Sequence, residues 1–303
     1  MTVVIPTYGH ADFIATALDS VLRQTLAPDE VWVINDGSPD ATDAAVAPYL
    51  PRIRYVVQNH QGVSATLNRS LEWVTTDCVM FLASDDWLEP NALEVLYAGL
   101  KAHPEVGVAH ANRGKWVNGV PLVKDAEVLH YGVYTDLPRL ILRYSVYAPA
   151  VLWRTAALHE ILPIPPYPYC QDWWMSIQVA LKGWPFLGIE DILGHYRRHE
   201  GNTTHPSRLG EIVRDEIAML TELVNSGQLS RALVDVAERA ISDRQRVLAW
   251  RCVETGQYEE ARRLFWRLAQ ERGGRVNAAA GLLASWMPRT LYLWSREVRR
   301  RGA

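Results

Sequence analysis

The feature that most constrains the fold is the alternation of strand and helix signals over the first ninety residues. Short apolar runs predict strands at residues 3–5, 30–34, 53–57 and 78–82. Helical signals occupy the segments between them, at residues 11–24, 40–47 and 64–71. Repeated strand–helix units of this size predict an α/β fold, with a mostly parallel sheet covered by helices on both faces. In such sheets ligands bind at the carboxyl ends of the strands.

The composition is that of an ordinary globular protein: of 303 residues, 49% are hydrophobic and 21% are charged. The net charge of −3 gives no reason to expect binding to nucleic acid. Three widely spaced cysteines, Cys78, Cys170 and Cys252, argue against a disulfide framework or a zinc site. The chain begins on a strand-like run and has no apolar run long enough to span a bilayer, so we expect a cytoplasmic protein without a signal peptide.

The strand and helix signals continue to about residue 200 and then give way to helix alone. Further strands are expected at 106–110, 115–123 and 186–189, and further helices at 91–103 and 171–182. Residues 207–225 and 230–270 carry helical patterns with few strand signals. We therefore predict two regions, an α/β domain over residues 1–205 and a helical region over residues 206–303.

The helical region contains two features that suggest interactions. Residues 248–265 resemble one tetratricopeptide-like hairpin, and since a single unit forms no solenoid, it is expected to pack on the α/β domain or to mediate a homodimer. Residues 282–301 combine an interrupted apolar face with several arginines, a mixture that suits peripheral association with an anionic membrane. A terminal helix that covers the core and ends in a solvated basic tail fits that pattern equally well.

The strand at residues 78–82 leads into two adjacent carboxylates, Asp85 and Asp86. Two neighbouring carboxylates repel each other, and burying either is costly unless a cation compensates. Such a pair suits a hard divalent metal held against phosphate oxygens. The alternative is a helix cap, because Asp favours helix starts and Pro90 suits a first helical turn.

Four motifs, taken together and in this order, resemble those of the family 2 glycosyltransferases, which have the Rossmann-like GT-A fold. They are Val4-Ile5-Pro6-Thr7-Tyr8, Ile34-Asn35-Asp36-Gly37-Ser38, Gly62-Val63-Ser64-Ala65-Thr66-Leu67-Asn68-Arg69 and Leu82-Ala83-Ser84-Asp85-Asp86. The resemblance covers about residues 1–200 and implies the GT-A fold for that part, followed by the C-terminal helical region.

The resemblance implies a site for a nucleoside-diphosphate sugar. Asp36 would recognise the nucleobase, with Pro6, Thr7 and Tyr8 as the wall of its pocket; an Asx-turn at Asp36 is the alternative. Asn68 would add to the nucleotide site, and Arg69 would either neutralise the diphosphate or lie on a solvated helix face.

Asp85 and Asp86 match the metal motif of the resembled family. Asp85 would contact the ribose or the metal, and Asp86 would bind the Mn²⁺ or Mg²⁺ that bridges the diphosphate. Ala83 stands where another Asp is often seen in that family, which leaves the division of labour between the two carboxylates open.

Two further segments match functional positions of the family. In Gln171-Asp172-Trp173, Asp172 would be the catalytic base, although Gln171 replaces the first acid of the family's pair; a helix cap beside core tryptophans is the alternative. In Tyr196-Arg197-Arg198-His199, the histidine would be a metal or phosphate ligand and one arginine a phosphate clamp, or His199 would be merely structural.

The function implied is that of a metal-dependent, inverting glycosyltransferase acting on a glycan or glycolipid acceptor in cell-surface polysaccharide assembly. Gln171 and Ala83 keep a second hypothesis open, a non-catalytic sugar-nucleotide-binding or scaffold protein on the same fold. A nucleotidyltransferase is disfavoured, because Pro6–His10 is not the Gly-rich, basic phosphate loop that such enzymes carry after their first strand.

Overall fold

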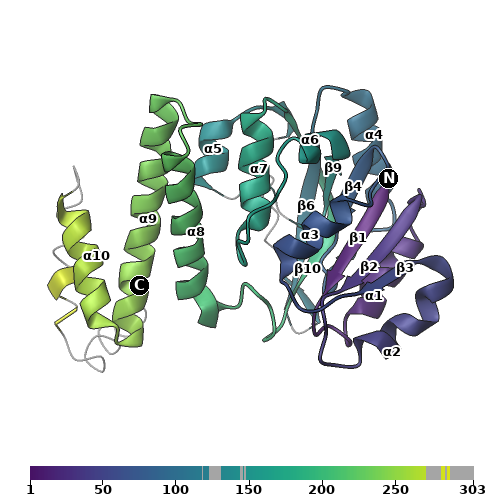
Figure 1. Ribbon diagram of the computed structural model, residues 1–303, viewed down its shortest axis with the longest axis horizontal. Coiled ribbons are helices and arrows are strands. Elements are labelled where there is room, and N and C mark those ends of the chain that lie inside the picture. The colour runs from purple at the N-terminus through teal and green to yellow at the C-terminus, as the bar shows by residue number, and fades with distance from the viewer. Residues whose placement is uncertain are drawn as a thin grey trace. The chain divides into compact units, whose positions relative to one another are not determined.

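The computed structural model describes residues 1–117, 119–122, 131–143, 146, 148–270, 281–283 and 285–286. The chain divides into two compact units, Met1–Asn202 and Thr203–Ala303 (Figure 1). The composition change that we placed near residue 205 lies close to this division, and the assignment of catalysis to the first part stays a prediction.

The first unit alternates strands and helices. Its strands are β1 Thr2–Thr7, β2 Glu30–Asn35, β3 Arg54–Val57, β4 Cys78–Phe81, β5 Trp87–Leu88, β6 Val108–Val117, β7 Val120–Leu122, β8 Gly132–Tyr134, β9 Val151–Arg154 and β10 Phe186–Arg198. Its helices are α1 Ile14–Leu22, α2 Thr42–Val46, η1 Ala47–Arg52, α3 Val63–Leu71, α4 Ala92–Ala102, α5 Leu137–Leu142, α6 Thr155–His159 and α7 Gln171–Leu181.

The described strands form one mixed, ten-stranded sheet in the order β3-β2-β1-β4-β9-β6-β10-β5, with β7 beside β6 and β8 beside β10. Strands β1 to β4 are parallel to one another, and β9 runs antiparallel to β4 and β6. Because β1, β2 and β4 are parallel neighbours, their carboxyl ends meet at one edge of the sheet.

Alternate side chains of the central strands point to opposite faces. Val3 and Ile5 of β1 belong to a buried core with α1 and α4, whereas Val4 is buried outside that cluster and α3 also contacts β1. Apolar side chains on both faces are what a strand covered by helices on both sides requires. The expected Rossmann-like, mixed sheet with helices is therefore present.

The structure departs from the expected elements around β6 and β10. Residues 108–117 form one strand, β6, and β7 returns beside it, where the sequence predicted strands at 106–110 and 115–123. The strand predicted at 186–189 continues to Arg198 as β10, with register shifts against β6 between Ile189 and Gly194. The predicted strand was too short because these irregularities fall on polar residues, which interrupt the apolar pattern.

The second unit is helical over its described residues. It contains η2 Pro206–Arg208, α8 Leu209–Asn225, α9 Arg231–Thr255 and α10 Tyr258–Gln270. Helix α9 packs against both α8 and α10, and Phe265 is fully buried in the apolar cluster that joins them. Gly256 ends α9 in the left-handed conformation, with φ +81°, which gives the tight turn into α10. The arginines at 289–301 lie outside the described residues.

Candidate active site

Hydrogen bonds join the carboxyl ends of β1, β2 and β4. The Asp36 N–H, just after β2, donates to the carbonyl of Thr7 at 2.9 Å. The Gly9 N–H after β1 donates to the Ser38 hydroxyl at 3.0 Å, and His10 Nδ1 lies 2.8 Å from the hydroxyl of Ser84 after β4. The candidate residues that follow these three strands therefore share one edge of the sheet.

The carboxylate of Asp36 is buried and surrounded by donors from residues 58–62. Its Oδ1 accepts from the Gln58 side chain at 2.7 Å and from the Gln61 N–H at 2.9 Å. Its Oδ2 accepts from the Gly62 N–H at 2.8 Å and lies 2.9 Å from His60 Nδ1. A Cβ at Gly37, where φ is +74°, would lie 3.0 Å from the backbone nitrogen of His60, so this close packing requires glycine.

Tyr8 and Thr7 lie beside this carboxylate at the end of β1. The Tyr8 ring stacks on His60 with centroids 4.1 Å apart, and Tyr8 is 46% exposed. The Thr7 hydroxyl is buried and has no hydrogen-bond partner among the described residues. Pro6 pairs in register with Ile34 inside the sheet. An unpaired buried hydroxyl and an exposed ring next to a carboxylate are features of a ligand site.

Asp85 meets the segment that follows β10. Its Oδ2 accepts from the Asn202 amide at 3.0 Å and lies 3.1 Å from His199 Nε2. Its backbone carbonyl accepts from the Arg197 guanidinium at 2.9 Å, and that guanidinium lies over the Trp87 ring at 4.6 Å. The Arg197 side chain thus stabilises the turn after β4.

His10 joins Asp85 and His199 to form a potential metal group. One donor atom from each of the three residues lies within 4.8 Å of the others. Burial lowers the pKa of His10, which favours the neutral imidazole that metals bind. Sequence reasoning missed His10, because its only signal was a position directly after β1, where a lone histidine has many ordinary roles.

Asp86 lies outside this group and points elsewhere. It is 2% exposed, and its Oδ1 accepts from the Arg197 N–H at 2.9 Å. Burial, and then the charge of Asp85, raise the pKa of Asp86 well above its usual range. This geometry favours Asp85 over Asp86 as the carboxylate that faces a metal, contrary to the order expected from the sequence.

Asn68 is bound to the proline-rich loop rather than directed at a ligand. Its amide donates to the Ile164 carbonyl and accepts from the Ile164 N–H, both at 2.8 Å. Arg69, beside it on α3, donates to the Gln58 side chain at 3.0 Å and lies over the Trp73 ring at 5.0 Å. We therefore leave Asn68 out of the proposed nucleotide site and assign it to positioning the loop.

Asp172 lies in the first turn of α7, directly after that loop. Its Oδ1 accepts from the Trp173 N–H at 2.8 Å, and the Trp173 indole donates to the Leu140 carbonyl at 2.5 Å. The side-chain oxygen of Gln171 is buried without a hydrogen-bond partner among the described residues. Asn68 anchors this loop to α3, and the Gly62 N–H directly before α3 donates to Asp36.

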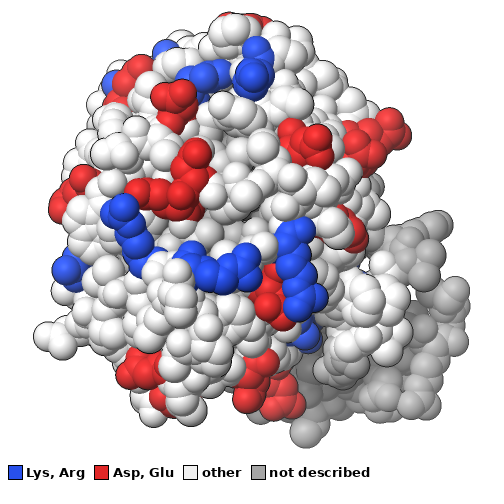
Figure 2. Space-filling view, turned by 90° about the vertical axis from the view of Figure 1, so that its right-hand side faces the viewer, with Lys and Arg blue, Asp and Glu red and all other residues white. Residues whose placement is uncertain are grey.

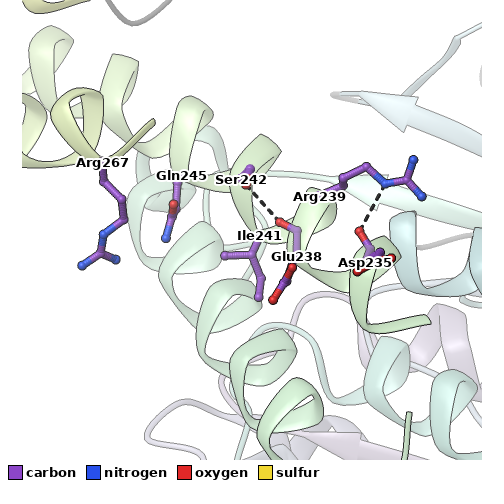
Figure 3. A pocket seen from close by; sticks show the side chains of 7 residues that line it. All are labelled: Asp235, Glu238, Arg239, Ile241, Ser242, Gln245 and Arg267. Carbon is purple, nitrogen blue, oxygen red and sulfur yellow. Dashed lines mark hydrogen bonds between the residues drawn. The ribbon is translucent and has the colours of Figure 1, made fainter. Parts of the chain in front are cut away.

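The cavity found in the second unit contains no predicted site residue. It has a volume of about 660 Å³ and is lined by α9 residues and by Arg267 of α10 (Figure 3). Arg239 and Ser242 donate hydrogen bonds there to backbone carbonyls of their own helix, at Asp235 and Glu238 (Figure 3).

On the face drawn in Figure 2, acidic and basic side chains occur together, in keeping with the small net charge. No helix among the described residues is long and apolar enough to cross a membrane.

Comparison with known proteins finds a family that the first part of the chain resembles. The model of glycosyl transferase family 2 matches residues 2–138, the segment that carries Tyr8, Asp36 and Asp85. Over these residues the chain is similar to glycosyl transferase family 2. Glycosyltransferase GlyA of Streptococcus pneumoniae is 36% identical over 100 residues, which are 32% of this chain and 14% of GlyA. The chain thus spans only a small part of this curated relative.

Solved structures support the fold over the whole chain. Staphylococcus aureus TarS 1–349, in complex with UDP-GlcNAc, matches with a TM-score of 0.64 at 17% identity, covering 98% of this chain and 91% of TarS 1–349. The mannosyltransferase PcManGT of Pyrobaculum calidifontis, in complex with GDP-Man and Mn²⁺, matches with a TM-score of 0.58 at 17% identity, covering 97% and 87% of the two chains. At these identities the likeness establishes the GT-A fold alone.

Proposed function

We propose that the protein is a metal-dependent glycosyltransferase that transfers a sugar from a nucleoside-diphosphate sugar to an acceptor hydroxyl. The observation that carries this proposal is the His10–Asp85–His199 group, which lies at the sheet edge shared with Asp36 and Tyr8. A cation there would lie at the strand ends where α/β folds bind ligands.

The donor atoms of this group fit a divalent transition metal. Two imidazoles and one carboxylate form a mixed set that suits Mn²⁺ better than Mg²⁺, which prefers oxygen ligands and retains several waters. A bound Mn²⁺ would stabilise the negative charge that develops on the departing nucleoside diphosphate. His10, Asp85 and His199 would hold it, and Asn202 would orient Asp85 through its 3.0 Å hydrogen bond.

The proposed donor site uses the residues around Asp36. Pro6, Thr7 and Tyr8 would contact the nucleoside, and the Asp36 carboxylate would accept a hydrogen bond from the base. The complexes of TarS with UDP-GlcNAc and of PcManGT with GDP-Man support a nucleotide-sugar donor on this fold.

Asp172 would act as the general base of a direct displacement. Its carboxylate would accept the proton of the acceptor hydroxyl while that oxygen forms a bond to the anomeric carbon. The bond from this carbon to the diphosphate breaks on the opposite side, so the configuration inverts. The Asp172 Oδ1 accepts from the Trp173 N–H at 2.8 Å, which orients the carboxylate in the first turn of α7.

We further propose a glycan or glycolipid acceptor and peripheral membrane association. The described part of the second unit supports the membrane proposal, since Trp266 and Trp286 are 64% and 75% exposed and Arg262 lies over the Trp286 ring at 4.6 Å. Exposed tryptophans beside arginines are typical of surfaces that bind anionic bilayers. Sedimentation of the full chain with phosphatidylglycerol vesicles, but not with phosphatidylcholine vesicles, is the expected result.

The proposed donor and metal requirement can be tested on the full chain without knowing the acceptor. Thermal shifts are measured with UDP, GDP, CDP and ADP, each with and without Mn²⁺, and then the slow hydrolysis of the corresponding sugar nucleotides is followed by release of the nucleoside diphosphate. We expect one nucleotide to stabilise the protein far more with Mn²⁺ than without it. Binding that is independent of the metal would contradict the proposed site.

The same experiment separates the enzyme from a non-catalytic binding protein. Gln171, with its buried and unpartnered oxygen, is the observation that keeps the second candidate under consideration. Tight, metal-linked nucleotide binding without turnover of any sugar nucleotide, alone or with glycolipid extracts, would favour the binding protein.

A further inference from the structure

Four neighbours surround the Asp36 carboxylate, but they are not held equally firmly. Gln58, Gln61 and Gly62 donate hydrogen bonds to it. His60 Nδ1 lies 2.9 Å from Oδ2 and 3.2 Å from the backbone carbonyl of Asp36. The Gln61 and Gly62 donors are backbone groups at the start of α3, and the Gln58 amide also donates to Thr66 and is held by Arg69. Among the described residues, only His60 approaches the carboxylate with an exposed side chain, which is 54% accessible.

His60 also occupies the face of Tyr8. The two rings are 26° from parallel with centroids 4.1 Å apart, the separation of rings in direct contact. No third ring fits between them. A planar base that used the Asp36 Oδ2 and the Tyr8 ring would therefore require the space that the His60 imidazole fills.

We propose that His60 is an internal substitute for the nucleobase and competes with the donor for its site. The imidazole presents a planar ring to Tyr8 and a ring nitrogen to Asp36, which are the two contacts that a base would make. Donor binding then requires His60 to rotate into solvent, and the base takes over both of its partners. This inference rests on the proposed function, because it assumes that Asp36 and Tyr8 form the base site.

The exchange also restricts the class of base. A carboxylate only accepts, so a base that replaces the His60 ring nitrogen at Oδ2 with a ring nitrogen of its own must carry an N–H there, as uracil and guanine do. Cytosine and adenine present an unprotonated ring nitrogen at the corresponding position, which would face the carboxylate lone pairs. Uridine or guanosine nucleotides are therefore the expected donors.

The substitution His60→Ala tests the competition. It removes the competitor and leaves the other three donors to Asp36 in place, while water reaches the exposed position that the ring vacates. The free energy spent on displacing His60 is no longer required, so UDP or GDP should bind roughly 3–10-fold more tightly in the presence of Mn²⁺. His103→Ala, at another histidine whose side chain is 42% exposed and pairs with a glutamate, is the matched control and should leave the affinity unchanged.

Pyrophosphate with Mn²⁺ supplies an internal control, because it lacks a base and should bind wild type and His60→Ala equally. In wild type labelled at histidine, the imidazole resonances that are missing from His60→Ala should move to solvent-like positions when the preferred nucleoside is added.

Unchanged or weaker nucleotide affinity in His60→Ala, in a variant that melts like wild type, overturns the inference and leaves the proposed function standing. A gain that appears equally with pyrophosphate also overturns it. If neither protein binds any of the four nucleoside diphosphates, the proposed function fails and this inference fails with it.

Discussion

The imidazole of His199 lies 3.1 Å from a carboxylate oxygen of Asp85, although 114 positions separate the two residues in the chain. The contact depends on β10, which runs to Arg198 and brings the following segment across the end of β4. Arg197 and Asn202 fix the same junction by binding the Asp85 carbonyl and carboxylate. Residues 197–202, at the end of the α/β unit, therefore belong to the same site as Asp85, which follows β4.

Removing the carboxylate of this contact should abolish the response to metal. Asp85→Asn keeps the shape of the side chain but removes the negative charge that a divalent cation requires. At a Mn²⁺ concentration 100 times its Kd, wild type should gain about 2.7 kcal/mol of unfolding free energy, and Asp85→Asn should gain close to none. Melting curves with and without Mn²⁺ measure this, and His205→Ala, at a half-buried histidine outside the group, should gain as much from Mn²⁺ as wild type.

His10 should contribute to metal affinity more weakly than Asp85. A neutral imidazole supplies a ligand atom but no charge, so His10→Ala should bind Mn²⁺ less tightly than wild type and more tightly than Asp85→Asn. Titration of Mn²⁺ by isothermal calorimetry gives the ranking. Equal affinity in His10→Ala and wild type would remove His10 from the group.

The two adjacent carboxylates illustrate what the sequence predicts and what it leaves open. The apolar run ending at Leu82 predicts a buried strand, and two acids after it predict a polar site at its end. Which acid faces the site depends on the turn geometry: Asp85 points to His199, whereas Asp86 points to the Arg197 N–H. Both partners lie on the distant β10 segment, so no local pattern distinguishes them.

Asn68 is a second residue whose contacts cannot be predicted from the local sequence. Its place in a family motif on α3 suggested a nucleotide contact, but its amide binds Ile164, 96 residues away. The helix period predicted its element correctly. The loop that lies against that helix face has an irregular, proline-rich sequence, and tertiary packing alone brings the two together.

Asp86 is expected to matter for stability through its hydrogen bond. Asp86→Asn retains an oxygen that accepts from the Arg197 N–H. Because burial raises the pKa of Asp86 and so favours its neutral form, the amide resembles the carboxyl that it replaces, and the unfolding free energy should stay near that of wild type. Asp86→Ala leaves that buried N–H without a partner, which costs about 1–3 kcal/mol. Urea unfolding of the two variants measures the difference, and equal losses in both would argue for a role of the charge itself.

Asn68→Ala should loosen the proline-rich loop without changing the affinity for nucleotide. The variant loses both hydrogen bonds to Ile164, with an expected loss of about 1–3 kcal/mol in unfolding free energy. Hydrogen exchange at the Ile164 and Tyr167 amides should become faster. Asn91→Ala, at the start of α4 where the side chain makes no capping bond, is the matched control and should have little effect. A large loss of nucleotide affinity in Asn68→Ala, with stability unchanged, would restore the direct nucleotide contact.

Asp172 should affect the chemical step and leave donor binding intact. Asp172→Asn keeps an oxygen that accepts from the Trp173 N–H, so α7 should begin as in wild type, but an amide accepts no proton from the acceptor hydroxyl. Loss of a general base lowers kcat by roughly 10²–10⁴-fold, while the Kd for the nucleoside diphosphate with Mn²⁺ should stay constant. Asp172→Glu should recover part of the activity, since it retains the base at a shifted position. A general base works only when it is ionised, so protonation of Asp172 should lower the wild-type rate at low pH. This acid limb of the pH–rate profile should disappear in Asp172→Asn, whereas a helix cap would give no such limb. Full turnover in that variant would leave Asp172 as a helix cap and require another base.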